Sequence, residues 1–161
     1  MSTFATEKES PPPMRFLGDY GAKTDAKGRV FLPAAFRKQM EAAGEERLIL
    51  RSDLFQHCLV LYPQTLWDEL LDALRSRLSR LNAEHQTMLR RWVADAEPVE
   101  LDGNGRFLIN KRKLAYAGIT NDVRFLAVDD HIEVWDRQAC EAQLEAADDL
   151  GAMLQGLDLG L

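Results

Sequence analysis

Hydrophobic positions along this chain fall mostly into short runs, and they follow helical spacing only in a few longer segments. Short apolar runs between Gly, Pro, Asn and Asp residues are typical of β-strands. They predict strands at about residues 16–23, 29–32, 47–51, 58–62, 98–101, 106–109, 123–128 and 131–135. Apolar residues three or four apart predict helices at about residues 33–40, 65–80, 83–94, 111–117 and 137–154. The pattern therefore predicts an α+β fold that is mainly β.

Local signals set the ends of several of these elements. Asn82 is predicted to cap the helix that follows it, and Gly118 is predicted to end the helix over 111–117. Asp129 and Asp130 are predicted to form a tight hairpin turn between the last two strands.

One pattern occurs twice along the chain. Segments 24–33 and 101–110 lie 77 residues apart, and both contain Asp-x-x-Gly-Arg followed by three apolar residues. Segment 58–62 matches 131–135 at an offset of 73, so the second copy is four residues shorter in its middle. A repeat this regular predicts one supersecondary unit used twice.

The repeat divides the chain into five parts. The polar start contains three consecutive prolines, which favour neither helix nor sheet, and it is predicted to be disordered. The predicted parts are an N-terminal extension (1–13), a first repeat (14–63), a connecting helical pair (64–96), a second repeat (97–136), and an acidic C-terminal helix and tail (137–161).

Composition narrows the class of protein. The chain has 161 residues, of which 46% are hydrophobic and 29% charged, so it can bury a core and is not a disordered chain. No apolar run approaches the roughly 20 residues that span a bilayer, and the first residues lack the apolar region of a secretory signal. With only two cysteines, the chain is predicted to be cytoplasmic and to lack a structural disulfide.

The net charge of −6 hides an uneven distribution. Residues 15–38 contain six Lys or Arg against two acids, whereas residues 129–161 contain nine acids and one Arg. A local basic surface is sufficient to meet phosphate, so the overall acidity does not exclude a nucleic-acid partner. The acidic end is interpreted as a solvated helix face.

The two Asp-x-x-Gly-Arg turns are the main candidate for chemistry. One copy alone would be interpreted as a structural hairpin turn, but two copies at matching positions favour a function. Arg29 and Arg106, each beside a rigid turn, can meet a phosphate or a guanine edge with two hydrogen bonds. Lys23 and Lys27 would add phosphate contacts, and Gly28 would let the backbone approach DNA closely.

Other chemistries find little support in the sequence. Neither a dinucleotide fingerprint nor a phosphate-binding P-loop is present, and the histidines and cysteines lack metal-ligand spacing. No nucleophile motif occurs, and Cys58 is predicted to be buried and inert. The three tryptophans are interpreted as core residues, and the arginines over 75–91 as a solvated helix face. We therefore predict no catalytic residue, no metal, no cofactor and no small-molecule substrate.

At the residue level the chain resembles the MraZ family, bacterial transcriptional regulators with two AbrB-like repeats. The resemblance rests on Asp25-Ala26-Lys27-Gly28-Arg29 with Pro33 and Phe36-Arg37, then on Cys58-Leu59-Val60-Leu61-Tyr62-Pro63 and Trp67. It resumes at Leu101-Asp102-Gly103-Asn104-Gly105-Arg106, Ala117-Gly118-Ile119 and Glu133-Val134-Trp135. It extends from about Met14 to Gln143.

This resemblance implies a swapped-hairpin β-barrel made by both repeats of one chain. It also implies a ring-shaped homo-oligomer that binds tandem repeats of double-stranded promoter DNA and represses its own division and cell-wall operon, with the protein at the nucleoid. The implied DNA contacts are Lys27, Arg29 and Arg106. The second repeat departs from the first, with Asn104 in place of Lys27 and Asn110 in place of Pro33. A non-catalytic protein-interaction or assembly module with the same fold is the alternative.

Overall fold

The structure is a computed structural model that describes residues 15–145 and 149–160. The predicted N-terminal extension lies outside the described residues. In chain order the elements are β1 (Asp19–Lys23), β2 (Arg29–Phe31), α1 (Ala34–Ala42), β3 (Leu48–Ser52), β4 (Leu59–Pro63), α2 (Gln64–Arg77), α3 (Ala83–Ala94), β5 (Glu97–Pro98), β6 (Arg106–Leu108), α4 (Lys111–Ala117), β7 (Asp122–Val128), β8 (His131–Asp136), α5 (Arg137–Glu145) and α6 (Leu150–Gln155). The fold mixes helices and strands, and the strand pairs among the described residues are antiparallel.

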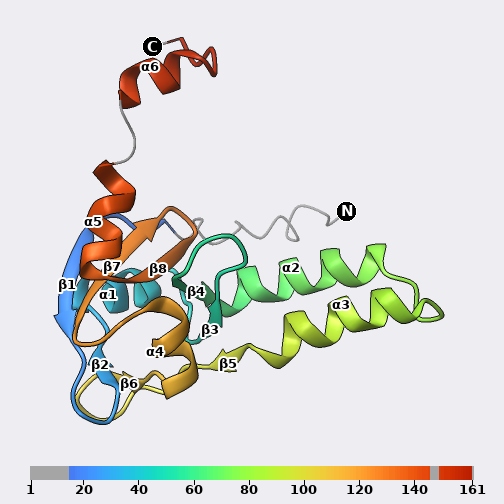
Figure 1. The fold of residues 1–161 in the computed structure, drawn as a ribbon, viewed down its shortest axis with the longest axis horizontal. Coiled ribbons are helices and arrows are strands. Elements are labelled where there is room, and N and C mark those ends of the chain that lie inside the picture. Colours follow the sequence, from blue (N-terminus) through green and yellow to red (C-terminus); the bar gives the residue numbers. More distant parts are fainter. Residues whose placement is uncertain (1–14, 146–148, 161) are drawn as a thin grey trace, which may run out of the picture.

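The strands form a six-stranded sheet in the order β1-β7-β8-β4-β3-β5 and a separate two-stranded ribbon of β2 and β6 (Figure 1). Equivalent strands of the two repeats occupy mirrored places in the sheet. β4 and β8 meet at its centre, β3 and β7 flank them, and β1 and β5 form the edges. The two repeats are therefore related by an approximate internal two-fold.

The repeats exchange their first strands. β1 of the first repeat pairs with β7 of the second, from Asp19 opposite Leu126 to Lys23 opposite Asp122. β5 of the second repeat pairs with β3 of the first, where Glu97 lies opposite Leu50. Strand pairing among the described residues does not close the six-stranded sheet, so the predicted β-barrel is not confirmed. The strand predicted over 98–101 is only partly observed: β5 covers Glu97 and Pro98, and Val99 N donates to the Leu48 carbonyl at 2.9 Å just beyond it.

Both repeats contribute to one core between the sheet and the ribbon. Val30 and Phe107 face inward from β2 and β6, with exposed fractions of 1% and 2%. Phe107 packs edge-on against Phe125 of β7, with ring centroids 6.3 Å apart. Because the ribbon has one apolar face against this core, its other face is fixed toward solvent.

Two of the three tryptophans are buried as predicted. Trp67 and Trp135 are 6% and 5% exposed, whereas Trp92 is only half-buried. Trp92 stacks on Trp67 with ring centroids 5.2 Å apart, and the Arg51 guanidinium lies 4.3 Å from its ring.

Helices α2 and α3 form an arm that projects from the sheet (Figure 1). Its tip confirms the predicted cap, because Asn82 Oδ1 accepts a hydrogen bond from His85 N at 3.1 Å. Trp67 is buried at the base of the arm, and no residue of α3 is buried.

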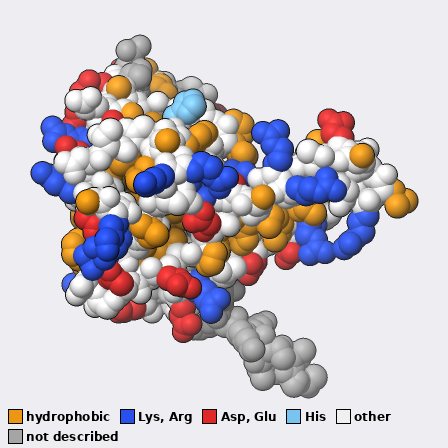
Figure 2. Space-filling model, turned by 60° about the horizontal axis from the view of Figure 1, so that its bottom comes forward, with side chains coloured by type: hydrophobic (Ala, Val, Ile, Leu, Met, Phe, Trp, Pro, Cys, Tyr) orange, Lys and Arg blue, Asp and Glu red, His pale blue; other side chains and the backbone are white. Residues whose placement is uncertain are grey.

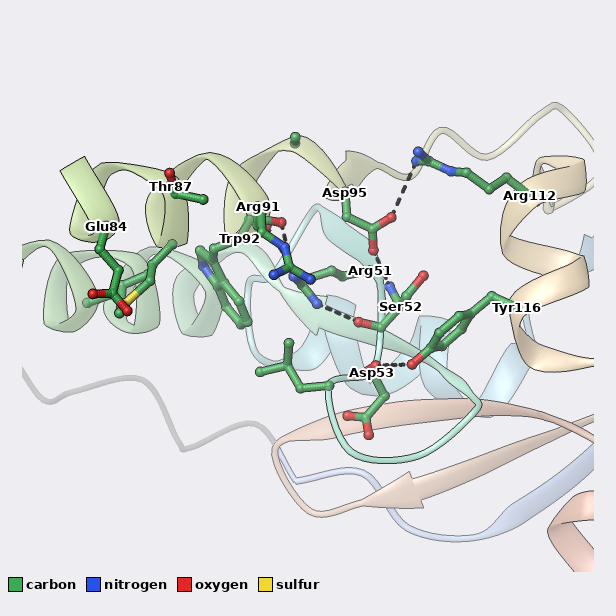
Figure 3. A pocket seen from close by; sticks show the side chains of 14 residues that line it. Arg51, Ser52, Asp53, Glu84, Thr87, Arg91, Trp92, Asp95, Arg112 and Tyr116 are labelled. Carbon is green, nitrogen blue, oxygen red and sulfur yellow. Dashed lines mark hydrogen bonds and ion pairs between the residues drawn. The ribbon is translucent and has the colours of Figure 1, made fainter.

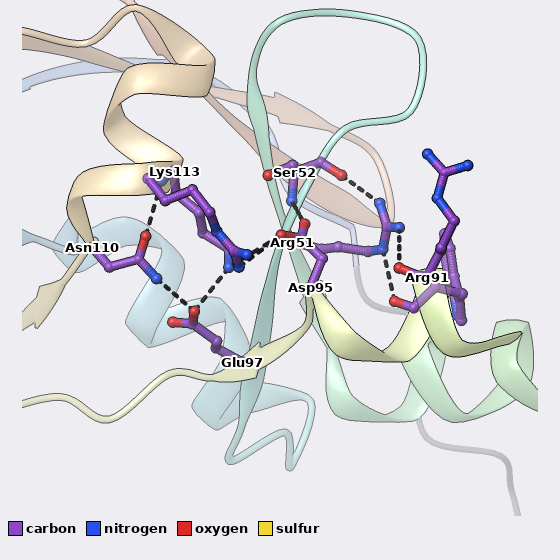
Figure 4. A network of polar contacts seen from close by, with 9 residues as sticks. Arg51, Ser52, Arg91, Asp95, Glu97, Asn110 and Lys113 are labelled. Atoms are coloured by element: carbon purple, nitrogen blue, oxygen red, sulfur yellow. Dashed lines mark hydrogen bonds and ion pairs between the residues drawn. The ribbon is translucent and has the colours of Figure 1, made fainter. Parts of the chain in front are cut away.

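A polar network ties the base of this arm to the second repeat (Figure 4). Lys113 of α4 is fully buried, and its Nζ lies 2.9 Å from Glu97 Oε1 and 3.6 Å from Asp95 Oδ1. Asn110 donates to the same Glu97 oxygen at 2.6 Å. Arg51 Nε donates to the Trp92 carbonyl at the end of α3 at 3.0 Å.

The prediction of one continuous helix over 137–154 is wrong. Helix α5 ends at Glu145 and α6 begins at Leu150, while residues 146–148 lie outside the described residues. Asp149 has extended backbone angles, and its Oδ1 accepts from Ala152 N at 3.3 Å. A side-chain cap of this kind begins a new helix.

Candidate functional site

The first Asp-x-x-Gly-Arg turn is held by its own aspartate. Asp25 Oδ1 accepts from the backbone N–H of Lys27 and of Arg29, both at 2.9 Å. Asp25 Oδ2 accepts from Arg29 Nε at 2.7 Å. The Arg29 N–H is the largest contribution that lowers the pKa of Asp25, which falls to about 2. The carboxylate is therefore ionised at neutral pH and fixes the direction of the guanidinium.

The second turn repeats this geometry. Asp102 Oδ1 accepts from the N–H of Asn104 and of Arg106, both at 2.9 Å, and Oδ2 accepts from Arg106 Nε at 2.9 Å. The Arg106 N–H again makes the largest contribution to lowering the pKa of the aspartate. The sequence motif thus specifies one local structure in both repeats.

Strands β2 and β6 bring the two turns onto one surface. Arg29 pairs with Leu108, and Phe31 pairs with Arg106. These four side chains share the outer face of the ribbon because alternate residues of a strand point the same way. Arg106 Nη1 lies 4.0 Å from Asp25 Oδ2, so the two turns are electrostatically coupled. The turns at the two ends of the ribbon form one site, which we call the ribbon face.

Most of the predicted site residues belong to these turns. Lys27 and Gly28 lie in the first turn with Arg29, and β6 brings Arg106 alongside. Lys23 ends β1 in the six-stranded sheet, where it lines a separate hollow with Asp19 and Asp122. Both arginine side chains are partly enclosed, with exposed fractions of 36% for Arg29 and 24% for Arg106. The hydrogen bonds to Asp25 and Asp102 hold their guanidinium groups in place.

Gly28 meets a backbone requirement in the first turn. Its φ is +90°, and a Cβ there would lie 2.6 Å from the Ile109 carbonyl oxygen. The Gly28 carbonyl also accepts from Ile109 N at 2.9 Å, which joins the first turn to the end of β6. Glycine therefore allows the turn to sit directly on the partner strand.

Sequence reasoning missed two residues of the ribbon face. Phe31 and Leu108 are 53% and 57% exposed, although each lies in a predicted apolar strand. The available signal was the two-residue period of a strand, which places them on the opposite face from Val30 and Phe107. Figure 2, which brings this end of the molecule forward, shows Lys and Arg side chains interspersed with hydrophobic ones.

A groove of about 860 Å³ lies between α3, α4 and the loop after β3 (Figure 3). Its polar groups are largely bonded to one another. Asp95 accepts from Ser52 N at 2.7 Å and from Arg112 at 3.3 Å, and the Tyr116 hydroxyl donates to the Asp53 carbonyl at 2.6 Å.

The cysteines and the potential metal ligands offer little chemistry in the described ranges. Cys58 and Cys140 are both fully buried, and burial raises the pKa of each thiol, so they are poor nucleophiles. Within residues 15–145 and 149–160, no group of three or more His, Cys, Asp or Glu side chains is placed to hold a metal ion. Of the helices described, none has the length and apolarity to cross a membrane.

Comparisons with known proteins agree with the repeat. The family model of the MraZ protein, described as antitoxin-like, matches residues 15–91 and 93–153. The transcriptional regulator MraZ of Phocaeicola vulgatus is 54% identical over 142 residues, which are 88% of this chain and 92% of that protein. The transcriptional regulator MraZ of Anaeromyxobacter dehalogenans is 34% identical over 131 residues, which are 81% of this chain and 90% of that protein. Since both repeats are matched almost end to end, the chain belongs to the MraZ family.

Proposed function

We propose that this chain is a sequence-specific, DNA-binding transcription regulator that uses the ribbon face to bind double-stranded promoter DNA. The observation that carries the proposal is the pair of aspartate-held arginines, Arg29 and Arg106, on one face of a two-stranded ribbon. A two-stranded β-ribbon fits the major groove of B-DNA, where an arginine fork can bind guanine O6 and N7 together. Relatives named transcriptional regulators support a role in transcription.

The geometry explains how the arginines could recognise bases. Each aspartate accepts a hydrogen bond from Nε of its arginine, which leaves the terminal nitrogens of the guanidinium for a ligand. Because the aspartate fixes the guanidinium before binding, association with DNA costs less side-chain entropy. The exposed Phe31 and Leu108 lie beside these arginines and can contact thymine methyl groups. Lys23 and Lys27 supply phosphate contacts. Gly28 is buried, and its N–H donates to the Asp25 carbonyl, so it shapes the turn and does not meet DNA as predicted.

The resemblance to the MraZ family implies a wider regulatory role. On that basis we propose a homo-oligomeric ring at the nucleoid, in the cytoplasm, that represses its own division and cell-wall operon from tandem promoter repeats. Avidity is compatible with a ring: one chain presents two arginine turns, and several copies on tandem DNA repeats can gain roughly 10²–10⁴ in avidity without new contacts.

The test is a fluorescence-anisotropy titration of the purified protein against the DNA upstream of its own gene. A shuffled DNA of equal length and two salt concentrations complete the design. We expect specific binding that weakens steeply with salt, because counterions compete for the phosphates. Arg29→Lys keeps the charge but removes the fork, and each base contact that the variant cannot make should cost about 1–3 kcal/mol of discrimination.

Arg15→Lys is the matched control for this titration. Arg15 is an exposed arginine that also pairs with an aspartate, Asp129, but it lies at the opposite end of β1 from the first turn. The control should bind as the unaltered protein does. Equal binding to both DNAs by an intact oligomer would contradict the proposal.

The alternative is a protein-interaction module, which the exposed Phe31 and Leu108 and the antitoxin-like family description favour. An apolar partner interface would be nearly insensitive to salt, whereas DNA binding is steeply sensitive. The same titration therefore separates the two functions.

A further inference from the structure

We infer that Arg37 of α1 is a DNA-phosphate contact that belongs to the second turn. This inference rests on the proposed function and assigns a further binding residue to it. It makes the second turn a composite of both repeats, because α1 belongs to the first repeat and the turn to the second.

The first observation is where the Arg37 guanidinium lies. A Cβ at Gly105 would be 2.7 Å from Arg37 Nη1 and 3.1 Å from its Cζ. The guanidinium therefore covers the backbone of the second turn, beside Arg106. Gly105 has a φ of +84° and is buried beneath it.

The second observation is an internal control supplied by the repeat. Leu114 lies 77 residues after Arg37 and occupies the same place in α4. A Cβ at Gly28 would be 3.3 Å from Leu114 Cδ1, so leucine covers the first turn as arginine covers the second. Since an apolar side chain fills this place in one copy, the fold does not need a charge there.

The third observation is that Arg37 lacks a counterion in the described part of the chain. Arg37 Nε is buried without a hydrogen-bond partner among those residues, and no ion pair joins its guanidinium to their carboxylates. Arg29 and Arg106, in contrast, each pair with an aspartate. Enclosing an uncompensated charge is costly, so an anion is expected to complete the site.

With Arg37 included, the two turns have the same number of cations. The first turn carries Lys27 and Arg29, whereas the second turn carries Arg106 and has Asn104 in place of the lysine. Arg37 restores the missing cation from a different segment of the chain. Each end of the ribbon face therefore presents two cations to the DNA backbone and base edges.

The experiment replaces Arg37 by leucine, the residue at the equivalent position of the second repeat. Arg37→Leu should stay folded because leucine already occupies the equivalent place. In anisotropy titrations with the upstream DNA and the shuffled DNA, affinity should fall by a similar factor for both. The slope of log K against log salt should become shallower by about 0.9 for each phosphate that the variant no longer neutralises. Arg37→Met serves the same purpose if the leucine variant is poorly folded.

Two further variants decide the interpretation. Lys38→Leu removes one charge from the next position of the same helix and should leave the slope unchanged; an equal loss would overturn the inference in favour of net charge. Asn104→Lys in the Arg37→Leu protein should restore the slope by returning a cation to the second turn. An unchanged slope in Arg37→Leu, with Arg29→Lys impaired, overturns this inference alone. Absence of salt-dependent DNA binding by the unaltered protein overturns the proposed function as well.

Discussion

The two repeats have the same order of strands and helices, but their first strand and first helix meet through an aromatic contact in one repeat and an ion pair in the other. In the first repeat, Tyr20 of β1 packs edge-on against Phe36 of α1, with ring centroids 5.1 Å apart. In the second repeat, the residues 77 positions later are Glu97 of β5 and Lys113 of α4, which form an ion pair of 2.9 Å. Phe36 and Lys113 are both fully buried. The aromatic pair of the first repeat therefore occupies the same position as the salt bridge of the second.

The salt bridge of the second repeat lies next to the arm of α2 and α3, whereas the aromatic pair of the first repeat has no such neighbour before it in the described chain. The chain enters β5 directly from the arm, and Asp95 at the end of α3 adds a second carboxylate to Lys113. Asn110 caps α4 by accepting from Lys113 N at 2.9 Å, a role that Pro33 does not fill for α1. The second repeat thus uses a polar network to fasten the arm, whereas the first repeat uses only apolar packing here.

The largest expected effect comes from breaking each pair. Phe36→Ala should cost about 3–5 kcal/mol of unfolding free energy, the usual range for a buried aromatic. Lys113→Ala should cost about 3 kcal/mol, the lower end for removing one partner of a buried ion pair, because both carboxylates keep contact with water. Urea denaturation followed by circular dichroism measures both changes.

A double exchange sharpens this first test. Glu97→Tyr with Lys113→Phe gives the second repeat the aromatic pair of the first, and well-packed apolar groups often replace an ion pair without loss. The double variant should be more stable than Lys113→Phe alone. If it is not, the two places are less equivalent than their 77-residue offset indicates.

The next largest effect is a difference in stability between alanine substitutions at the two turn glycines, Gly28 and Gly105. At Gly28 a Cβ would meet the Ile109 carbonyl oxygen, which is backbone, whereas at Gly105 it would meet the end of the long Arg37 side chain, which can shift more easily than backbone. Both have positive φ, which costs an alanine about 1–2 kcal/mol. Gly28→Ala should therefore lower the melting temperature more than Gly105→Ala. Equal losses would show that backbone strain alone sets the cost.

Much of this architecture follows from local sequence signals. The spacing of the repeat, the Asx geometry of both turns, the Asn82 cap and the end of α4 at Gly118 all depend on residues close together in the chain. Lys27, Arg29 and Arg106 were predicted as site residues for the same reason, although their contact with DNA stays a prediction.

The remainder depends on contacts between the repeats. Lys113 resembles a surface lysine in sequence, and only β5 and α3 supply the carboxylates that allow its burial. Arg37 reaches the second turn because α1 follows β2, which pairs with β6 directly after that turn. The break before α6 escaped prediction because Asp149 can either continue a solvated helix face or cap a new helix.

Acid should weaken the ionic contact of Lys113 in the second repeat but not the aromatic contact of Phe36 in the first. Burial disfavours the charged form of Asp95, but the Ser52 N–H and Lys113 outweigh it and lower the pKa of Asp95. A lowered pKa gives stability that is complete above the ordinary value of about 4 and is lost as pH falls through the folded value. The stability difference between the unaltered protein and Lys113→Met should therefore shrink below about pH 4. For Phe36→Ala the difference should change little over the same range, and a parallel decrease would contradict an electrostatic cause.

The smallest expected effect concerns Lys27 and Asn104, which occupy the same place in the two turns. Lys27→Asn makes the first turn resemble the second, and Asn104→Lys does the reverse. If both turns approach phosphates, the salt slope of DNA binding should become shallower by about 0.9 in the first variant and steeper by about 0.9 in the second. The double variant exchanges the two residues and should keep the original slope, because the number of cations on the ribbon face is unchanged. A response to Lys27→Asn without a response to Asn104→Lys would mean that only the first turn reaches the DNA backbone. The approximate two-fold of the fold would then not extend to its contact with DNA.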